Sequence, residues 1–485
     1  MNTAEPLGRV AIVGAGVAGL AAAYFLRDSG ADVVVLEAAA RIGGKLAVSD
    51  IAGIPADAGA EALLARRPEG VELIKAVGLG GDLVSPGTTT AGIWTRGQFR
   101  PLPRRHFMGV PADFADLERS AILSSGGLER ARQDALLPPA TRNGDVAVAE
   151  FVGDRFGSEV VDRIVDPLLG GVYAGRTDQL SFDATIPALS IASRSHRSLA
   201  EAALSLVAGS GPARQGTAQA SGPPVQPAPV FTTLAAGLGT LPDVLARTSG
   251  ADVRTRATVR ELARSAVGWR LTVGPAVAPE QIDADALILA LPARPASRLI
   301  SQVAGARDAA TALAEIEYAS MAIVTLAYPA TAFPEPLTGS GYLVPAVDGH
   351  PVKAVTFSTV KWPHLGGDMH VVRCSIGRIG EEAVLQRDDA DLAALAVADL
   401  ATATGVTGTP VASRVTRWGG GLPQYTVGHL DRVDRIRVAV AAQPGLAVCG
   451  AAYDGIGIPA CIASARLAAD QVVAHLATKV PAPRP

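Results

Sequence analysis

The chain has 485 residues, enough for two or three domains of ~150 residues each, and 48% of its residues are hydrophobic against 18% charged. This composition excludes a disordered or fibrous chain. The formal net charge of −3 excludes a global positive field of the kind that holds nucleic acid or an anionic bilayer.

The cysteines and the N-terminal segment indicate the compartment. Cys374, Cys449 and Cys461 are too few and too scattered for a disulfide framework or a metal cluster, which favours a reducing compartment. Met1–Arg9 lacks the basic start of a signal peptide. The most apolar run, Val10–Leu26, is interrupted by three glycines and is shorter than the ~20 residues that span a bilayer. We therefore expect a cytoplasmic protein without a transmembrane segment, and leave association with a membrane surface open.

The first elements in chain order form a β-α-β unit. Arg9–Val13 is a β-branched run typical of a buried strand, and the pattern then predicts a helix over Ala18–Ser29 that ends at Gly30. Ala31–Leu36 is the second strand, and Glu37 follows it directly.

The remaining chain alternates between helical and strand-rich stretches. Residues 110–205 have a helical pattern, and residues 209–229 (GSGPARQGTAQASGPPVQPAP) have no periodic apolar positions, which predicts a flexible insertion. After the insertion we expect strands at Ala251–Val259, Trp269–Val273, Ala286–Leu291, within Met321–Ile376 and at Gly445–Gly450, and a last helix over Pro459–Thr478.

The loop after the first strand reads Gly14-Ala15-Gly16-Val17-Ala18-Gly19. Gly14 permits a tight turn, Gly16 lets a pyrophosphate approach the backbone, and Gly19 lets the helix pack closely on the strand. The helix N-terminus supplies free N–H groups and a partial positive charge for phosphates. Glu37 lies eighteen residues beyond Gly19, where a carboxylate accepts hydrogen bonds from both ribose hydroxyls and repels a 2′-phosphate. The unit therefore predicts FAD or NAD rather than NADP.

A second glycine turn distinguishes between these two cofactors. Arg41-Ile-Gly43-Gly44-Lys45 follows the second strand and is similar to a turn of the amine-oxidase-like flavoproteins. No second GxGxxG motif occurs in the sequence, although a reductase that takes electrons from NAD(P)H usually needs another dinucleotide module. FAD, in an oxidase or desaturase that the substrate reduces directly, is therefore the expected cofactor.

Motifs along most of the chain carry a more specific resemblance. The C-terminal segment Cys449–Ile462 resembles the flavin-binding end of the protoporphyrinogen and coproporphyrinogen oxidases. Further segments similar to this family are Pro167–Gly175 with Leu180-Ser181, Gly341–Pro345, Lys361–His364 and Leu422–His429. The resemblance covers nearly the whole chain except residues 209–229.

The resemblance implies an α/β fold with a discontinuous Rossmann-like FAD-binding domain, a mixed-sheet substrate domain and a helical domain. On this basis the FAD-binding domain takes residues 1–65, 230–295 and 429–485, the substrate domain takes residues 66–105 and 296–428, and residues 106–208 form the helical domain. The family holds FAD without a covalent bond. It oxidises a porphyrinogen to a porphyrin in three two-electron steps of haem biosynthesis, and O2 reoxidises the flavin and leaves as H2O2.

Carried over position by position, the resemblance implies the contacts of the cofactor and the substrate. The implied cofactor-binding residues are Gly14, Ala15, Gly16, Val17, Ala18, Gly19, Glu37, Ala38, Arg41, Gly44, Lys45, Gly59, Ala60, Glu61, Ala62, Val259, Ile456, Gly457 and Ile458. On the substrate side, Gly171 matches a glycine whose carbonyl accepts from a pyrrole N–H, and Leu343 matches an aliphatic residue that packs on the macrocycle. No side chain is expected to act as a catalytic acid or base. Structural hydrogen bonds are the better interpretation of Tyr425 and His429.

One departure concerns the choice of substrate. Some members place an arginine, thought to pair with a propionate, where this chain has Ala91, and the nearby cations are Arg96, Arg100, Arg104 and Arg105. Coproporphyrinogen III carries four propionates and protoporphyrinogen IX carries two. The Ala-, Arg- and Gly-rich composition is typical of a GC-rich bacterial genome, and Gram-positive bacteria of that kind generally use the coproporphyrin-dependent route. Coproporphyrinogen III is therefore the preferred substrate.

Other interpretations stay open at this point. They are a protoporphyrinogen IX oxidase, an amine oxidase or desaturase of the same fold, and a flavin- or porphyrin-binding protein that is not an enzyme. An amine oxidase usually cages its substrate with aromatic rings, whereas this chain has 4% aromatic residues and carries Ile456 and Ile458 before its last helix. The expected partners are the porphyrinogen and O2, with a transient contact to ferrochelatase left open.

Overall fold

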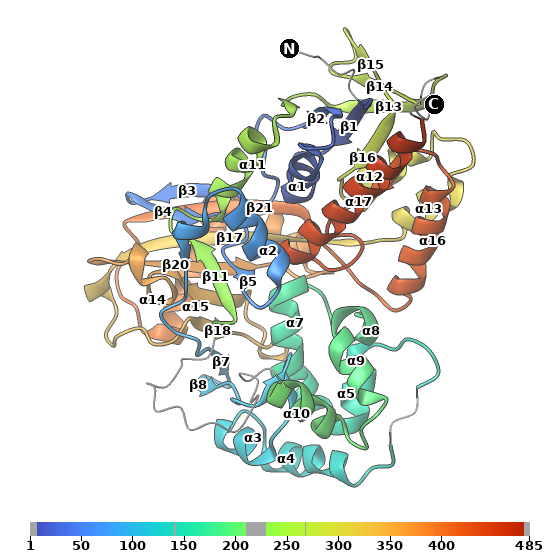
Figure 1. Cartoon of the computed structure of the whole chain (residues 1–485). Coiled ribbons are helices and arrows are strands. Elements are labelled where there is room, and N and C mark those ends of the chain that lie inside the picture. Colours follow the sequence, from blue (N-terminus) through green and yellow to red (C-terminus); the bar gives the residue numbers. More distant parts are fainter. Residues whose placement is uncertain (1–6, 140–141, 210–228, 267, 480–485) are drawn as a thin grey trace, which may run out of the picture.

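The structure, a computed structural model, describes residues 7–139, 142–209, 229–266 and 268–479. Most of the predicted insertion, residues 210–228, lies outside the described residues. The described chain forms three regions: a five-stranded sheet with its flanking elements, a seven-stranded sheet, and a group of helices (Figure 1).

The five-stranded sheet is parallel throughout and has the order β12-β2-β1-β16-β22. Its strands are β1 (Arg9–Val13), β2 (Asp32–Leu36), β12 (Asp252–Arg254), β16 (Ala286–Leu289) and β22 (Leu446–Val448). Residues along β1 alternate between two apolar clusters, with Val10 and Ile12 in one and Ala11 and Val13 in the other. Both faces are thus covered, as expected of a parallel sheet.

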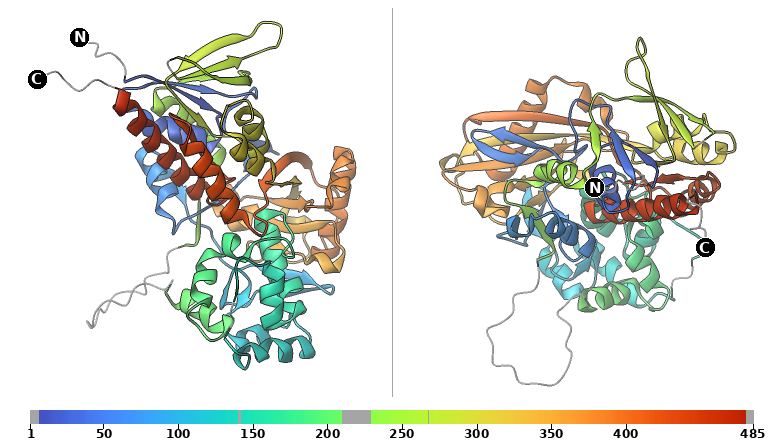
Figure 2. Two further views of the ribbon diagram at one scale, coloured as in Figure 1. Left: turned by 90° about the vertical axis from the view of Figure 1, so that its right-hand side faces the viewer. Right: turned by 45° about the horizontal axis from the view of Figure 1, so that its top comes forward.

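Helices cover one face of this sheet, and a small sheet with further helices covers the other. The first face carries α1 (Val17–Leu26), α2 (Pro68–Ala76), α11 (Leu241–Ser249) and α17 (Ile458–Lys479). The second carries β13 (Val259–Arg264), β14 (Trp269–Val273), β15 (Glu280–Ala284), α12 (Ala293–Ile300), α13 (Arg307–Ala314) and α16 (His429–Ala441). The N-terminal end of α17 points toward the junction of the three regions (Figures 1 and 2).

The seven-stranded sheet is mixed, with the order β21-β17-β20-β19-β18-β7-β8. Its strands are β7 (Gly92–Thr95), β8 (Gln98–Pro101), β17 (Tyr318–Pro329), β18 (Gly341–Leu343), β19 (Val352–Phe357), β20 (Met369–Ile376) and β21 (Ala412–Pro423). Only the β7–β18 pair is parallel among the pairs described in this sheet. The helix α15 (Asp389–Thr404) packs on one face, and the other face is turned toward the remaining two regions.

The helical region lies at the bottom of Figure 1. Its helices are α3 (Phe114–Ser120), α4 (Ser125–Arg132), α5 (Val148–Phe156), α6 (Ser158–Val160), α7 (Asp166–Tyr173), α8 (Phe182–Thr185), α9 (Pro187–Ser193) and α10 (Leu199–Gly209). Short elements complete the described chain: β3 (Val48–Ile51), β4 (Ile54–Asp57), β5 (Leu63–Leu64), β6 (Leu83–Val84), β9 (His106–Phe107), β10 (Val110–Pro111), β11 (Phe231–Leu234) and α14 (Ser358–Lys361). No helix in the described ranges is long and apolar enough to cross a membrane.

The structure confirms the α/β class and corrects one predicted element. Ala251–Val259 is not a single strand, because the chain leaves β12 after Arg254 and enters β13 only at Val259. Arg256 between them has φ +55°, and backbone hydrogen bonds tie this turn to Glu37 and Ala39. A β-branched run predicted the strands but not the turn, which contacts distant in sequence stabilise. The domain boundaries stay a prediction.

Candidate functional site

The loop between β1 and α1 has the geometry of a phosphate-binding turn. Gly14 has φ +104°, and its N–H donates to the Leu36 carbonyl at 2.8 Å. A Cβ on Gly19 would lie 1.9 Å from the Gly14 carbonyl oxygen, so only glycine allows α1 to sit this close to the turn. A Cβ on Gly16 would meet no described protein atom within 4 Å. The Gly16 side is therefore open to a pyrophosphate at the helix N-terminus.

Glu37 is fixed beside this loop. Its Oε2 accepts from the Ala15 N–H at 2.8 Å, and its Oε1 accepts from the Ala39 N–H at 2.8 Å. Each carboxylate oxygen keeps a further lone pair, which ribose hydroxyls can use. Val259 begins β13 two residues after Ala257, whose N–H donates to the Glu37 carbonyl at 2.8 Å. The structure thus brings Val259, a residue from the middle of the chain, close to the predicted ribose contact.

The Arg41–Lys45 turn packs against the phosphate loop. The Gly43 N–H donates to the Ala15 carbonyl at 2.7 Å, and Gly43 pairs with Gly16 as a parallel bridge. The Arg41 guanidinium donates to the Gly44 carbonyl at 2.7 Å and to the Ile42 carbonyl at 3.1 Å. Arg41 therefore uses these donors to stabilise the turn itself, whereas the resemblance predicts that Arg41 faces the cofactor.

Lys45 is the second cation of this turn, and its ammonium group makes no hydrogen bond within the described residues. Burial lowers the pKa of its ammonium group, and no carboxylate of the described chain pairs with it. Its electrostatic interaction with Cys461 places it beside the first turn of α17. Lys45 is half-buried, and a partly desolvated cation with no partner among the described residues is stabilised when something negative binds there, so Lys45 fits the neighbourhood of an anionic cofactor.

The Gly59–Ala62 segment lies against Lys45. The Ala60 N–H donates to the Lys45 carbonyl at 3.2 Å, and a Cβ on Gly59 would come within 1.9 Å of that oxygen. The Glu61 side chain is engaged elsewhere, in ion pairs with Lys361 and Arg373. Burial raises the pKa of Glu61, but the two cations outweigh this and lower it to about 2. The backbone of the segment, rather than the Glu61 carboxylate, is therefore available to a flavin.

Tyr425 positions the segment that leads into α17. Its hydroxyl donates to the Ala451 carbonyl at 2.7 Å and accepts from the Gly455 N–H at 2.8 Å, and its ring stacks on His429 at 3.8 Å. Burial lowers the pKa of His429 to about 4, so this imidazole is neutral at pH 7. Tyr425 makes the structural hydrogen bonds expected of it, and His429 Nε2 lies 3.3 Å from the Tyr453 carbonyl oxygen, while the lack of a catalytic role for either residue stays a prediction. The segment held by these Tyr425 hydrogen bonds leads directly into Ile456 and Gly457 and then into Ile458, the first residue of α17.

The two predicted substrate residues meet across the junction between the helical region and the seven-stranded sheet. A Cβ built on Gly171 of α7 would lie 3.3 Å from Leu343 Cδ2 of β18. Leu343 and Ile456 are both half-buried and pack against the same apolar cluster. Gly171, Leu343 and the flavin-side residue Ile456, from three distant stretches of sequence, therefore converge on one apolar cluster.

Two supporting residues were missed by the sequence analysis. Trp418 of β21 donates from Nε1 to the Ala58 carbonyl at 3.0 Å, and Arg373 of β20 donates to the Gly59 carbonyl at 2.6 Å. Both hold the Gly59–Ala62 segment from strands more than 300 residues away. No local pattern marks them, because each lies within an ordinary strand.

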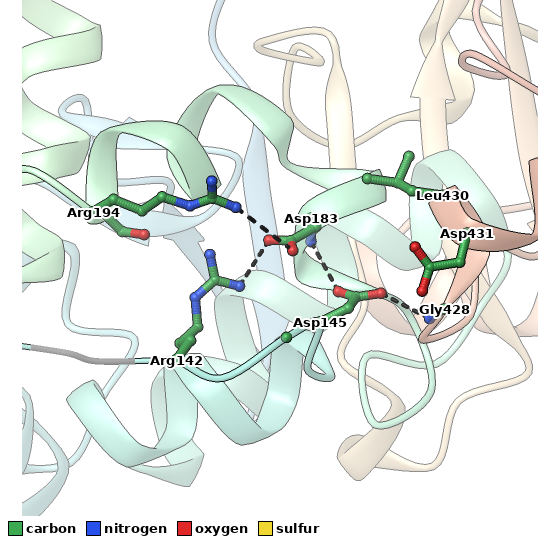
Figure 3. Close-up of a pocket in the computed structure, with 9 residues that line it drawn as sticks. Arg142, Asp145, Asp183, Arg194, Gly428, Leu430 and Asp431 are labelled. Atoms are coloured by element: carbon green, nitrogen blue, oxygen red, sulfur yellow. Dashed lines mark hydrogen bonds and ion pairs between the residues drawn. The ribbon is translucent and has the colours of Figure 1, made fainter. Parts of the chain in front are cut away.

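A separate pocket of about 310 Å³ lies between the helical region and the start of α16 (Figure 3). Arg142 and Arg194 pair with Asp183 there, and Asp145 accepts from the Gly428 N–H at 2.8 Å. None of its lining residues is a predicted cofactor or substrate residue. Asp145 instead joins the helical region to α16.

Comparisons with known proteins agree with this arrangement. The profile of the flavin-containing amine oxidoreductase family matches residues 17–473. The coproporphyrinogen III oxidase of Mycobacterium tuberculosis is 38% identical over 97% of this chain and 98% of its own length. That of Bacillus subtilis is 29% identical over 96% and 98%. A crystal structure from Exiguobacterium sp. 255-15, provisionally assigned as a protoporphyrinogen oxidase, superposes with a TM-score of 0.83 at 29% identity, covering 96% of this chain and 98% of that one.

These matches extend over both the cofactor side and the substrate side of the site. FAD is accordingly the cofactor, and the chain is an FAD-dependent oxidase. The phosphate loop, Glu37 and Lys45, which has no ion-pair partner in the described part of the chain, are consistent with a bound dinucleotide. The assignment of individual contacts stays a prediction. The chain belongs to the flavin-containing amine oxidoreductase family.

Proposed function

We propose that this chain oxidises coproporphyrinogen III to coproporphyrin III in haem biosynthesis. The reaction balances as one porphyrinogen and three O2 giving one porphyrin and three H2O2. The observation that carries the proposal is the similarity, over nearly the full length of both chains, to relatives named coproporphyrinogen III oxidase. The proximity of Gly171 to Leu343, near the cluster that Ile456 also joins, supports it, because these residues offer an apolar macrocycle a small, apolar surface.

Bound FAD supplies a two-electron acceptor that takes a hydride and later passes the electrons to O2. The residues of the chain bind and orient. The α1 N-terminus and Glu37 hold the adenosine diphosphate half, and Lys45 with the α17 N-terminus places positive charge where reduction adds negative charge. Leu343 and Ile456 pack on the macrocycle and exclude water, and the Gly171 carbonyl accepts from a pyrrole N–H. Positioning and electrostatics are thus the main contributions of the protein.

Protoporphyrinogen IX is the second candidate substrate, because the Exiguobacterium protein carries that provisional assignment. An amine substrate is less favoured, since Tyr173 and Tyr425, two aromatic residues close to this region, are buried, and Tyr425 is held by hydrogen bonds. The proposal keeps the cytoplasmic location and the transient contact with ferrochelatase as predictions from sequence.

Porphyrin fluorescence tests the proposal. Purified holoenzyme receives coproporphyrinogen III or protoporphyrinogen IX in air, with an enzyme-free control for autoxidation and a parallel assay for H2O2. We expect faster oxidation of coproporphyrinogen III, with three H2O2 for each porphyrin. Preference for protoporphyrinogen IX would favour the second candidate, and no rate above the control with either substrate, despite bound FAD, would contradict both.

A further inference from the structure

Coproporphyrinogen III carries four carboxylates, and a carboxylate that leaves bulk water needs a cation or several hydrogen-bond donors. If the proposed function holds, the chain must supply such groups around Leu343 and Gly171. Four arginines lie in the sequence near this region, and the structure distinguishes between them: Arg96, Arg100, Arg104 and Arg105.

Two of the four are committed to contacts within the protein. Arg96 donates to the Ile122 carbonyl at 2.6 Å and pairs with Glu159 at 3.2 Å. Arg105 pairs with Asp113 at 3.4 Å. Arg104 follows the end of β8 and is exposed.

Arg100 lies in the same row of the seven-stranded sheet as the predicted substrate residue. Leu343 on β18 is in register with Ile93 on β7, and Ile93 is in register with Arg100 on β8. Residues in register on adjacent strands point to the same face. Ile93 is buried in the apolar cluster of the helical region, and Leu343 packs against that cluster. Arg100 thus shares a face with the residue that contacts Gly171.

The residues that alternate with this row confirm which face it is. Trp94 and Phe99 pair in the row on one side of this one, and Tyr342 lies in the row on its other side. The Phe99 ring contacts both, tilted against Trp94 with centroids 4.9 Å apart and edge-to-face with Tyr342 at 5.1 Å. Trp94 and Tyr342 belong to the cluster on which α15 packs, on the opposite side of the sheet. Arg100 is therefore directed away from α15 and toward the side of the proposed substrate.

The same face also carries the link to the flavin segment. The row continues from Leu343 through Ala354 to Ser375, and Arg373, two residues before Ser375, donates to the Gly59 carbonyl at 2.6 Å. This sheet face therefore runs from the predicted isoalloxazine segment to Arg100 at its edge strand. Arg100 lies two strands from Leu343 on this face, across Ile93.

Arg100 has donors to spare. It is half-buried, it hydrogen-bonds the Gln98 side chain, and it forms no ion pair with any carboxylate in the described ranges. A guanidinium presents five N–H donors in a planar fork that matches a carboxylate.

We propose that Arg100 binds a propionate carboxylate of the porphyrinogen and thereby favours the substrate with more carboxylates. The proposal rests on the proposed function. It assigns to Arg100 the carboxylate-binding role that the resemblance gives to an arginine at the position of Ala91, the residue before β7.

The test compares Arg100→Gln with Arg104→Gln, an exposed arginine four residues further on. A hydrogen bond to a charged group contributes enough for about a tenfold change in binding. We expect Arg100→Gln to raise the KM for coproporphyrinogen III about tenfold with a much smaller effect on kcat, Arg100→Lys to be intermediate, and Arg104→Gln to match the wild type. Adding Ala91→Arg to Arg100→Gln should restore most of the lost affinity.

A substrate without carboxylates distinguishes a contact from a structural effect. The tetramethyl ester of coproporphyrinogen III, presented in detergent, should be oxidised with the same kcat/KM by the wild type and by Arg100→Gln. An equal loss with the ester, an unchanged KM in Arg100→Gln, or an equal effect of Arg104→Gln would overturn the proposal.

Measuring how tightly the protein binds the product tests the role of Arg100 independently of whether the chain is an active oxidase. Fluorescence titration of the holoenzymes with coproporphyrin III should show about tenfold weaker binding to Arg100→Gln even if the wild type proves inactive as an oxidase. An active wild type whose product binding does not depend on Arg100 would reject the role of Arg100 alone.

Discussion

Lys361 Nζ lies 2.5 Å from Oε1 of Glu61, although the two residues are 300 positions apart in the chain. Arg373 contacts the other oxygen of the same carboxylate, so two cations, Lys361 at the end of α14 and Arg373 on β20, hold the predicted flavin segment. The Glu61 and Arg373 side chains are 13% and 8% exposed, a degree of burial at which loss of one partner leaves uncompensated charge.

We expect Glu61→Gln to reduce the free energy of unfolding by about 3 kcal/mol, because it leaves two buried cations without their anion. Urea denaturation measures this change. Glu69→Gln breaks a more exposed pair with Arg67 and should cost less than about 1 kcal/mol. Equal costs for the two variants would contradict the structural importance of the Glu61 ion pairs.

The same carboxyl predicts a loss of stability in acid. The pKa of Glu61 falls from its ordinary 4.5 to about 2 on folding, since the two cations outweigh the effect of burial. Its stabilisation is therefore complete above about pH 4.5 and is lost as the pH falls toward 2. The Tm of the wild type should fall more steeply than that of Glu61→Gln in this range.

Asp57 predicts a pH dependence of opposite sign. Burial raises the pKa of its carboxyl from 3.8 to about 6, although the Leu238 and Gly239 N–H groups donate to it. The folded state therefore binds the proton more tightly than the unfolded state, and the contribution of Asp57 to stability decreases as the pH rises from about 4 to 6. Asp57→Asn should have a flatter Tm profile over this range, and an unchanged slope would contradict the assignment.

Two glycines of the phosphate loop have different predicted roles: Gly19 is required for packing, and Gly16 leaves room for the cofactor. A Cβ at Gly19 would overlap the Gly14 carbonyl oxygen, so Gly19→Ala should lower the Tm of the apoprotein by several degrees. A Cβ at Gly16 meets no described atom, so Gly16→Ala should leave the apoprotein Tm unchanged and weaken FAD binding at least tenfold. Thermal unfolding and flavin absorbance after gel filtration measure the two effects. Normal FAD content in Gly16→Ala would remove this residue from the predicted site.

Tyr425→Phe should loosen the segment before α17. The variant loses the hydrogen bonds to Ala451 and Gly455 and leaves the Gly455 N–H without that acceptor, at a cost of about 1–3 kcal/mol. We expect a lower Tm and faster FAD dissociation. Tyr453→Phe is the matched control, because the buried Tyr453 hydroxyl has no hydrogen-bond partner in the described ranges, and its removal should be neutral or stabilising. Equal effects of the two variants would contradict the role of the Tyr425 hydroxyl in holding the segment before α17.

The local sequence pattern was sufficient to predict the elements that form the dinucleotide-binding unit. The β-branched run, the three glycines and Glu37 lie within 29 consecutive residues, and β1, α1 and β2 form close to where the sequence predicts them. A local pattern failed at Ala251–Val259, because the turn at Arg256 is held by Glu37 and Ala39, more than two hundred residues away. Propensity describes a residue and its neighbours in the chain, whereas a turn of this kind depends on contacts that exist only in the folded molecule.

The sequence by itself determined the FAD-type loop, the α/β class and, through its motifs, the resemblance to porphyrinogen oxidases. Only the tertiary structure decided what the charged side chains do. Arg41 stabilises its own turn, Glu61 pairs with Lys361 and Arg373, Lys45 has no ion-pair partner among the described residues, and Arg100 shares a face with Leu343. The physical reason is that a motif fixes the path of the backbone over a few residues, while the partner of a long charged side chain is set by register and packing between strands hundreds of residues apart.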